Sequence, residues 1–89
     1  MNRHLKTSIV ENFRNTELGF LRIRKNLKIQ DYSDRATENY LRGILLSTPL
    51  DCIEKKGKNY YFTSTKFNAI LTVNSHSLTI ITAKQIGLV

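Results

Sequence analysis

The sequence predicts an α+β fold, with two to three N-terminal helices packed on a C-terminal antiparallel meander of about four strands. Two observations predict it. Apolar residues recur at helical spacing up to residue 47, and from residue 51 to residue 84 they alternate with polar residues between turn clusters. A chain of 89 residues can bury one modest core. We therefore expect a single domain over residues 1–89, with a helical part at about 5–47 and a sheet at about 51–84.

The first helix is expected over residues 5–14. Leu5, Ile9 and Val10 lie there at helical spacing, and Asn15 and Thr16 interrupt the pattern. We therefore expect a short amphipathic helix with one apolar face.

A second helix is expected from Thr16, whose hydroxyl can cap the first turn, with Leu18 and Leu21 pointing toward the core. Gly19 is unusual within it, because glycine costs about 1 kcal/mol relative to alanine inside a helix. It indicates a close approach by another element or a looser turn. Arg22 and Lys25 share one face of this helix, which is either a solvated surface or a surface that grips phosphates.

A third helix is expected to begin at a cap on Ser33 or Asp34. It should stop near Ser47, because Pro49 disfavours the helical conformation at the residue before it. The apolar stripe of this helix consists of Ala36, Tyr40, Leu41, Ile44 and Leu45. Short strands are then expected at residues 51–55 and 59–63, joined by a turn at 56–57.

The last two strands, residues 68–74 and 77–83, are interpreted as a hairpin with residues 75–76 at its tip. In this register Asn74 faces Ser77 and Thr72 faces Thr79. One face would bury Leu71, Val73, Leu78 and Ile80, and the other would carry a polar quartet of Thr72, Asn74, Ser77 and Thr79. The polar quartet is therefore the predicted working surface.

Charge is distributed unevenly along the chain. Fourteen Lys and Arg against seven Asp and Glu give a net charge of +7, yet residues 55–89 contain lysines and no carboxylate. We favour a surface for polyanions over a charge that only keeps the protein in solution. The single cysteine, Cys52, excludes an internal disulfide and is expected as a reduced, partly buried thiol. No apolar run approaches the roughly 18 residues of a spanning helix, so we expect no membrane and a cytoplasmic location.

The available residue types exclude several kinds of site. The sequence contains no Gly-rich phosphate loop, no zinc-ligand spacing and no carboxylate cluster for magnesium, so neither a metal nor a cofactor is expected. Metal-independent chemistry on RNA remains, because Lys, Thr, Asn, Tyr and His side chains can align a 2′-hydroxyl and stabilise phosphorane charge. His76 is either an acid or base for such chemistry or a solvated turn residue.

Five segments of the chain carry a resemblance to a known family: residues 16–19 (TELG), 22–27 (RIRKNL), 57–61 (GKNYY), 72–74 (TVN) and 79–83 (TIITA). They resemble the small bacterial family of domain of unknown function 3781, which would cover residues 16–86, with Tyr60 where that family is expected to have tryptophan. That family brings no function with it. More distantly, the pattern resembles the metal-independent ribonuclease toxins of the barnase, colicin-D and RelE-like group. This second resemblance implies a catalytic surface of Lys58, Asn74 and Thr82 with Arg22 or Lys25.

We expect a small basic RNA-directed protein of the ribonuclease-toxin type, and the sequence leaves open whether it is an enzyme. The expected catalytic residues are Lys58, Asn74, Thr72 and Thr82. The expected nucleic-acid-binding residues are Arg22, Lys25, Tyr61, Ser77 and Thr79. RNA is the expected partner, and a protein inhibitor or antitoxin is a further one.

Two alternatives stay open. The protein could bind nucleic acid, or block an acidic or nucleic-acid-binding partner, without catalysis, as small phage-borne inhibitors of bacterial defence do. Alternatively, Ile70 and Ile81, or the C-terminal residues Ile86, Leu88 and Val89, could form an oligomer or antitoxin contact. A toxin normally has an inhibitor, so several of these functions can hold together.

Overall fold

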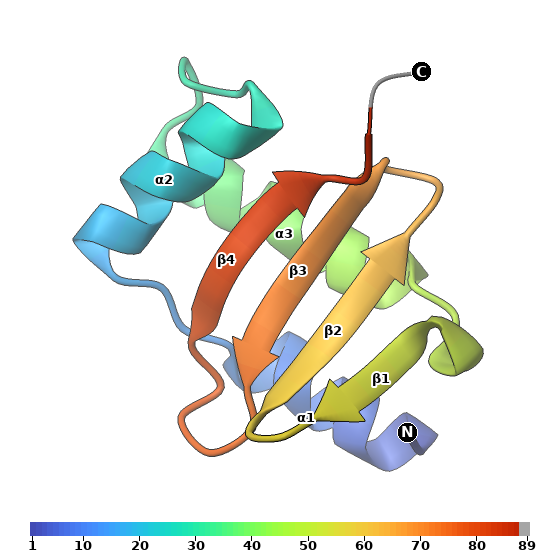
Figure 1. Cartoon of the computed structure of the whole chain (residues 1–89). Coiled ribbons are helices and arrows are strands. Elements are labelled where there is room, and N and C mark those ends of the chain that lie inside the picture. The colour runs from blue at the N-terminus through green and yellow to red at the C-terminus, as the bar shows by residue number, and fades with distance from the viewer. Residues whose placement is uncertain (88–89) are drawn as a thin grey trace.

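The computed structural model describes residues 1–87 as a four-stranded antiparallel sheet with a layer of helices on one face, of which the helix at residues 17–27 lies along the edge formed by the last strand (Figure 1). The elements are α1 (Arg3–Asn12), α2 (Glu17–Leu27), α3 (Asp34–Ser47), a 3-10 helix at Leu50–Cys52, β1 (Ile53–Lys56), β2 (Asn59–Ser64), β3 (Ala69–Asn74) and β4 (Ile80–Gln85). The strands lie in the order β1-β2-β3-β4, as a meander. The predicted α+β arrangement of helices followed by an antiparallel sheet is therefore confirmed. Leu88 and Val89, expected above as a contact surface, lie outside the described residues.

Side-chain caps begin the helices. The Thr16 hydroxyl accepts a hydrogen bond from the amide N of Gly19 at 2.9 Å, and the Ser33 hydroxyl accepts one from the amide N of Ala36 at 3.1 Å. The caps expected at Thr16 and Ser33 are thus confirmed. Asn2 caps α1, so this helix covers residues 3–12 rather than the expected 5–14.

Gly19 is explained by the cap itself. A Cβ atom at this position would lie 2.9 Å from the Thr16 hydroxyl oxygen and 4.0 Å from the carbonyl oxygen of Ile80 in β4. The first distance is too short for a carbon atom, whereas the second is ordinary contact. Glycine therefore leaves room for the cap while α2 packs along β4.

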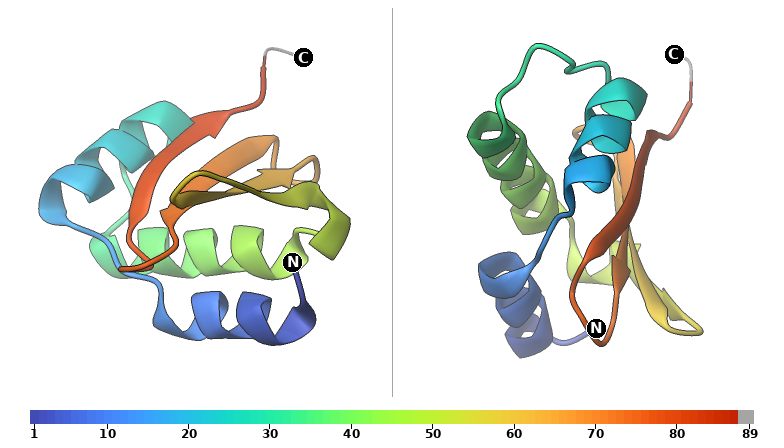
Figure 2. Two further views of the ribbon diagram at one scale, coloured as in Figure 1. Left: turned by 60° about the horizontal axis from the view of Figure 1, so that its bottom comes forward. Right: turned by 90° about the vertical axis from the view of Figure 1, so that its left-hand side faces the viewer.

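The core lies between the helix layer and the covered face of the sheet (Figure 2). Its fully buried side chains include Ile9 of α1, Ile23 of α2, Leu41 and Ile44 of α3, and Phe62 and Leu71 of the sheet. The prediction that Leu18 and Leu21 point inward is wrong, because these side chains are 65% and 58% exposed. Ile23 and Leu27 face the core instead. Among residues 1–87, no helix combines the length and the apolar character needed to cross a membrane.

The predicted register of the last hairpin is wrong. β3 ends at Asn74 and β4 begins at Ile80, so the connection spans residues 75–79 instead of two residues. Thr72 faces Thr82 rather than Thr79, and a register shift beyond this pair makes Val73 face Ile80. Ile81 is thereby the extra residue of a β-bulge.

Three features of the structure accompany this longer connection. The Asn74 side-chain oxygen Oδ1 accepts hydrogen bonds from the amide N of His76 and of Ser77, each at 2.9 Å. Leu78 has a φ of 59°, in the left-handed region, which interrupts the strand. Thr79 forms a parallel bridge with Arg14 in the α1–α2 linker instead of pairing with Thr72. The polar quartet is therefore not a set of facing residues on two strands.

Candidate functional site

The sheet surface turned away from the helices, here called the open face, points toward the reader in Figure 1. Burial alternates along β2, where Tyr60, Phe62 and Ser64 are buried and the residues between them are partly exposed. Paired residues on neighbouring strands share a face of the sheet, so the pairing of β2 with β3 shows which residues of β3 share the open face. Side chains at Asn59, Tyr61, Thr63, Ile70, Thr72, Asn74, Thr82 and Lys84 thus belong to the open face.

One row across this face brings together three of the predicted site residues. Tyr61 pairs with Thr72, Thr72 pairs with Thr82, and Glu54 of β1 pairs with Tyr61 on the other side. Thr72 is the most enclosed of them, with 8% of its surface exposed. The row therefore places an aromatic ring and two hydroxyl groups on neighbouring strands.

The larger of two hollows on the open face has a volume of about 520 Å³. It is lined by Asn26 of α2 and by Asn59, Tyr61, Ile70, Thr72, Ile81, Thr82 and Lys84 of the sheet. We call it the β4–α2 hollow. Arg22 lies one helical turn before Asn26 and both are exposed, so Arg22 extends this rim, with Lys25 beside it.

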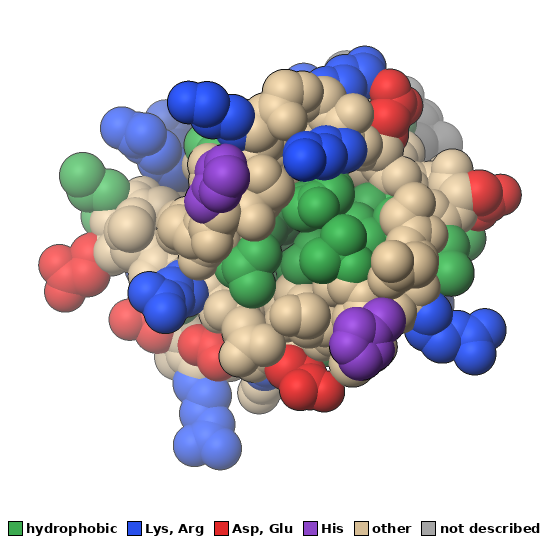
Figure 3. All heavy atoms as spheres, turned by 90° about the horizontal axis from the view of Figure 1, so that it is seen from below, with side chains coloured by type: hydrophobic (Ala, Val, Ile, Leu, Met, Phe, Trp, Pro, Cys, Tyr) green, Lys and Arg blue, Asp and Glu red, His purple; other side chains and the backbone are tan. Residues whose placement is uncertain are grey.

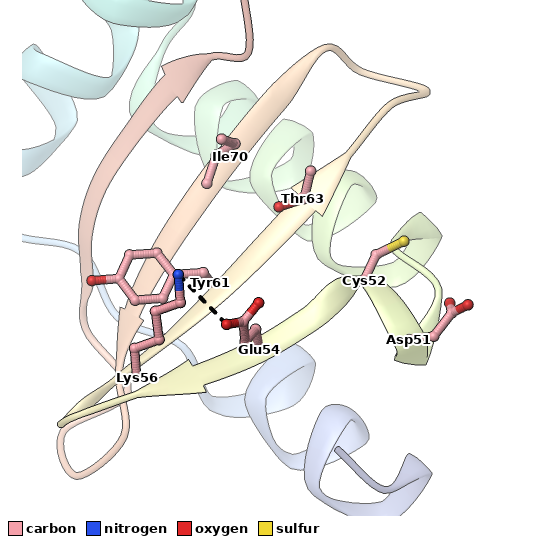
Figure 4. Close-up of a pocket in the computed structure, with 7 residues that line it drawn as sticks. All are labelled: Asp51, Cys52, Glu54, Lys56, Tyr61, Thr63 and Ile70. Atoms are coloured by element: carbon pink, nitrogen blue, oxygen red, sulfur yellow. Dashed lines mark ion pairs between the residues drawn. The ribbon is translucent and has the colours of Figure 1, made fainter.

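A smaller hollow of about 290 Å³ adjoins the first, because Tyr61 and Ile70 line both. Its remaining lining residues are Asp51, Cys52, Glu54, Lys56 and Thr63 (Figure 4). We call it the β1–β2 hollow. The open face is consequently asymmetric in charge, because Asp51 and Glu54 line the β1–β2 hollow beside Lys56, whereas Lys84 is the charged residue that lines the β4–α2 hollow.

The other predicted site residues lie at the end of the sheet, in its turns. Lys58 is exposed in the β1–β2 turn, and its carbonyl oxygen accepts a hydrogen bond from the Ser75 amide at 2.8 Å. The Ser77 hydroxyl donates to Asn74 Oδ1 at 3.2 Å and lies 3.0 Å from the Thr79 hydroxyl. Asn74, Ser77 and Thr79 therefore hold the β3–β4 connection, and they do not line either hollow.

Several residues of the open face were missing from the expected site. Alternation from Tyr61 leads to Asn59, and alternation from Thr82 leads to Lys84, so period two could have found both. Asn26 reaches the β4–α2 hollow only through the packing of α2 on β4. No local pattern in the sequence reports that packing.

The end of the molecule with the two turns shows apolar side chains at its centre and the two histidines of the chain apart from one another (Figure 3). His76 lies in the β3–β4 connection and is exposed. Within residues 1–87, no group of three or more His, Cys, Asp or Glu side chains is arranged to hold a metal ion.

Comparisons with known proteins identify a family and leave the activity unassigned. The searches of curated proteins and of solved structures found no match, and nothing in the comparisons supports the resemblance to ribonuclease toxins. A family model does match residues 7–84, which include α2, α3 and nearly all of the sheet. The chain therefore belongs to the family described as a protein of unknown function (DUF3781).

Proposed function

We propose that the protein binds single-stranded RNA across the open face of its sheet. The observation that carries this proposal is the β4–α2 hollow, where the Tyr61 ring, the Thr72 and Thr82 side chains and Lys84 surround one space. A base can stack on an aromatic ring, and hydroxyl and amide groups can bond the ribose 2′-hydroxyl. A duplex keeps its bases stacked on one another, so a single strand is the form that fits.

The cations of α2 and β4 would hold the phosphates. Arg22 and Lys25 are exposed on α2 within one helical turn of Asn26, which lines the hollow, and Lys84 lines the hollow itself. The net charge of +7 adds long-range attraction for a polyanion. We assign the activity to the cytoplasm, in keeping with the free thiol of Cys52.

Salt dependence tests the phosphate contacts. Affinity for a labelled single-stranded RNA is measured by fluorescence anisotropy over a range of salt concentrations, for the wild type and for Arg22→Ala/Lys84→Ala. Each lost phosphate contact lowers the slope of log affinity against log salt by about 0.7, so the double variant should lose about 1.4. Arg3→Ala/Arg35→Ala removes the same charge from exposed positions in the helix layer and should keep the slope.

A separate variant tests the stacking contact. Tyr61→Ala should weaken RNA binding by about fivefold to 150-fold, because stacking of a base on an aromatic side chain contributes about 1–3 kcal/mol. The loss should be independent of salt, since no charge changes.

In the salt experiment, an affinity that does not change with salt would contradict binding on this face. An equal loss of slope in Arg22→Ala/Lys84→Ala and in Arg3→Ala/Arg35→Ala would contradict it as well.

Metal-independent cleavage of the bound strand is the second candidate function. The direct pairing of Thr72 with Thr82 beside Tyr61 favours it, since hydroxyl groups could orient the scissile phosphate and its 2′-hydroxyl. Lys58 would add positive charge from the end of the same sheet. In this toxin-type form of the proposal, a protein inhibitor or antitoxin would act by covering the open face.

Incubation with total RNA in excess EDTA tests cleavage. Wild type should cut RNA, whereas Thr72→Val/Thr82→Val, which removes the hydroxyls and keeps the side-chain shape, should bind without cutting. Lys58→Ala tests a further predicted catalytic residue, because its hydrogen bond with the Ser75 amide uses the backbone carbonyl, which alanine keeps. Intact RNA in every lane, together with normal binding, would leave binding alone as the function.

A further inference from the structure

We infer that the β1–β2 hollow is a base-selective subsite that accepts a nucleobase with an exocyclic amino group and disfavours uracil. This inference rests on the proposed function, because the base would belong to the RNA strand held on the open face. It adds a specificity that the cations and the Tyr61 ring do not provide by themselves.

The hollow has the size and the walls that a base needs. It has a volume of about 290 Å³, and the Tyr61 and Ile70 side chains that line it also line the β4–α2 hollow. Figure 4 shows Glu54, Lys56 and Tyr61 close together at one end, with Cys52 and Asp51 at the other. A strand lying over the β4–α2 hollow can therefore place one base beside Tyr61, on the β1 side.

Glu54 supplies the selectivity. It is the direct cross-strand partner of Tyr61, and both side chains line this hollow. An ionised carboxylate only accepts hydrogen bonds, and the amino groups of cytosine and adenine donate them. Uracil presents a carbonyl oxygen where cytosine has its amino group, and a carboxylate repels that oxygen.

Lys56 occupies the place of the base in the free protein. Its ammonium nitrogen lies 3.5 Å from Glu54 Oε1 and 6.0 Å from the centre of the Tyr61 ring. The pair is exposed, with 67% and 68% of the two side chains accessible, and such pairs contribute little to stability. An incoming base can therefore displace Lys56, which leaves Glu54 open to an amino group and frees the ammonium for a phosphate.

Binding of three labelled oligonucleotides, oligo(rA), oligo(rC) and oligo(rU) of equal length, tests the inference at one salt concentration. The wild type should bind oligo(rU) about tenfold more weakly than the other two, the discrimination of one good base contact. Glu54→Gln puts a donating amide where the carboxylate was, so the preference should vanish or reverse. Glu38→Gln removes a carboxylate of α3 in the helix layer and should keep the preference.

The outcomes separate the inference from the proposed function. Equal affinity of the wild type for all three oligonucleotides, or an unchanged preference in Glu54→Gln, would overturn the subsite while RNA binding stands. A uniform gain in affinity in both glutamine variants would also overturn it, because that gain reports only the lost negative charge. Absence of binding to all three oligonucleotides would overturn the proposed function itself. Thermal unfolding of Glu54→Gln should match the wild type, since the side chain is exposed.

Discussion

At the scale of single residues, Asn74 is the position whose role the structure changes most. It was expected in catalysis, yet its Oδ1 accepts hydrogen bonds from the His76 amide, the Ser77 amide and the Ser77 hydroxyl. The side chain thus organises the β3–β4 connection. A loss of RNA cleavage on truncating Asn74 would therefore have a structural explanation.

Substitutions of Asn74 should separate the two roles. Asn74→Ala should lower the free energy of unfolding by about 1–2 kcal/mol, because the donors of the loop lose their shared acceptor. Asn74→Asp keeps an acceptor oxygen and should cost less. Urea unfolding measures both variants, and equal losses for Ala and Asp would contradict the capping role.

Substitutions at Thr16 and at Gly19 should have coupled effects on the free energy of unfolding. Thr16→Ala removes the cap and should cost about 1 kcal/mol. Gly19→Ala places a carbon 2.9 Å from the Thr16 hydroxyl oxygen, which displaces the cap, but it gains about 1 kcal/mol of helix propensity. The single Gly19→Ala change should therefore be nearly neutral. In its presence Thr16→Ala should cost almost nothing, and a double-mutant cycle in urea that gives additive losses would contradict the coupling.

The Tyr40 phenol should make the stability of the folded state depend on pH. Burial raises the pKa of its phenol above the ordinary value, and Tyr32 adds to the effect. The folded state therefore keeps the proton to higher pH than the unfolded state, whose pKa is about 10. Its stabilising contribution is complete below pH 10 and is lost as the pH rises through the folded-state pKa. Stability measured from pH 9 to 11 should fall less steeply for Tyr40→Phe than for the wild type.

At the scale of elements, the helices were more predictable than the last hairpin. The caps on Thr16 and Ser33 depend on residues three positions apart, so the sequence pattern contains them completely. The β3–β4 register depends on Leu78 in the left-handed region and on the bridge from Thr79 to Arg14, more than sixty residues earlier in the chain. Neither feature leaves a local signal.

The bulge at Ile81 shows how this error affects the site. Strict alternation from the buried Ile80 would place Thr82 on the covered face of the sheet. The extra residue turns Thr82 to the open face, where it pairs with Thr72. Tyr61 and Thr72 could be predicted there from period two, whereas the pairing with Thr82 and the approach of Asn26 required the folded structure.

Lys6 of α1 contacts the C-terminal end of α3. The Lys6 ammonium donates hydrogen bonds to the carbonyl oxygens of Leu46 and Thr48, both at 2.7 Å, at the C-terminal end of α3. These carbonyls have no partner within the helix, and the cation also complements the helix dipole. Lys6→Met should lower the free energy of unfolding by about 1.5–3 kcal/mol, the range for hydrogen bonds of charged groups.

A matched variant separates this contact from a general effect of charge. Arg3→Met removes a cation from an exposed position of the same helix and should change stability little. Thermal and urea unfolding compare the two variants. Similar losses for both would show that the bonds from Lys6 contribute nothing of their own.

At the scale of the whole molecule, positive charge exceeds what ion pairs can offset. The net charge is +7, and the ion pairs among residues 1–87 are Arg24 with Asp34, Arg42 with Glu38, and Lys56 with Glu54. Exposed pairs contribute little and salt weakens them. Self-repulsion of the remaining cations destabilises the compact state, and salt weakens that repulsion too.

Salt should therefore have opposite effects on the free protein and on its complex with RNA. In the free protein, raising sodium chloride from low to physiological concentration should raise the melting temperature, because screened repulsion outweighs the weakened ion pairs. RNA at a hundredfold excess over its dissociation constant should add about 2.7 kcal/mol, or roughly 10–20 °C for a domain of this size. That added shift should shrink as salt rises, because phosphate contacts release counterions.

Two outcomes would contradict these expectations. A shift in melting temperature on adding RNA that stays constant with salt would mean that RNA is held without phosphate contacts. A melting temperature of the free protein that falls with salt would mean that ion pairs outweigh repulsion. Scanning calorimetry at several salt concentrations, with and without RNA, distinguishes these cases in one series.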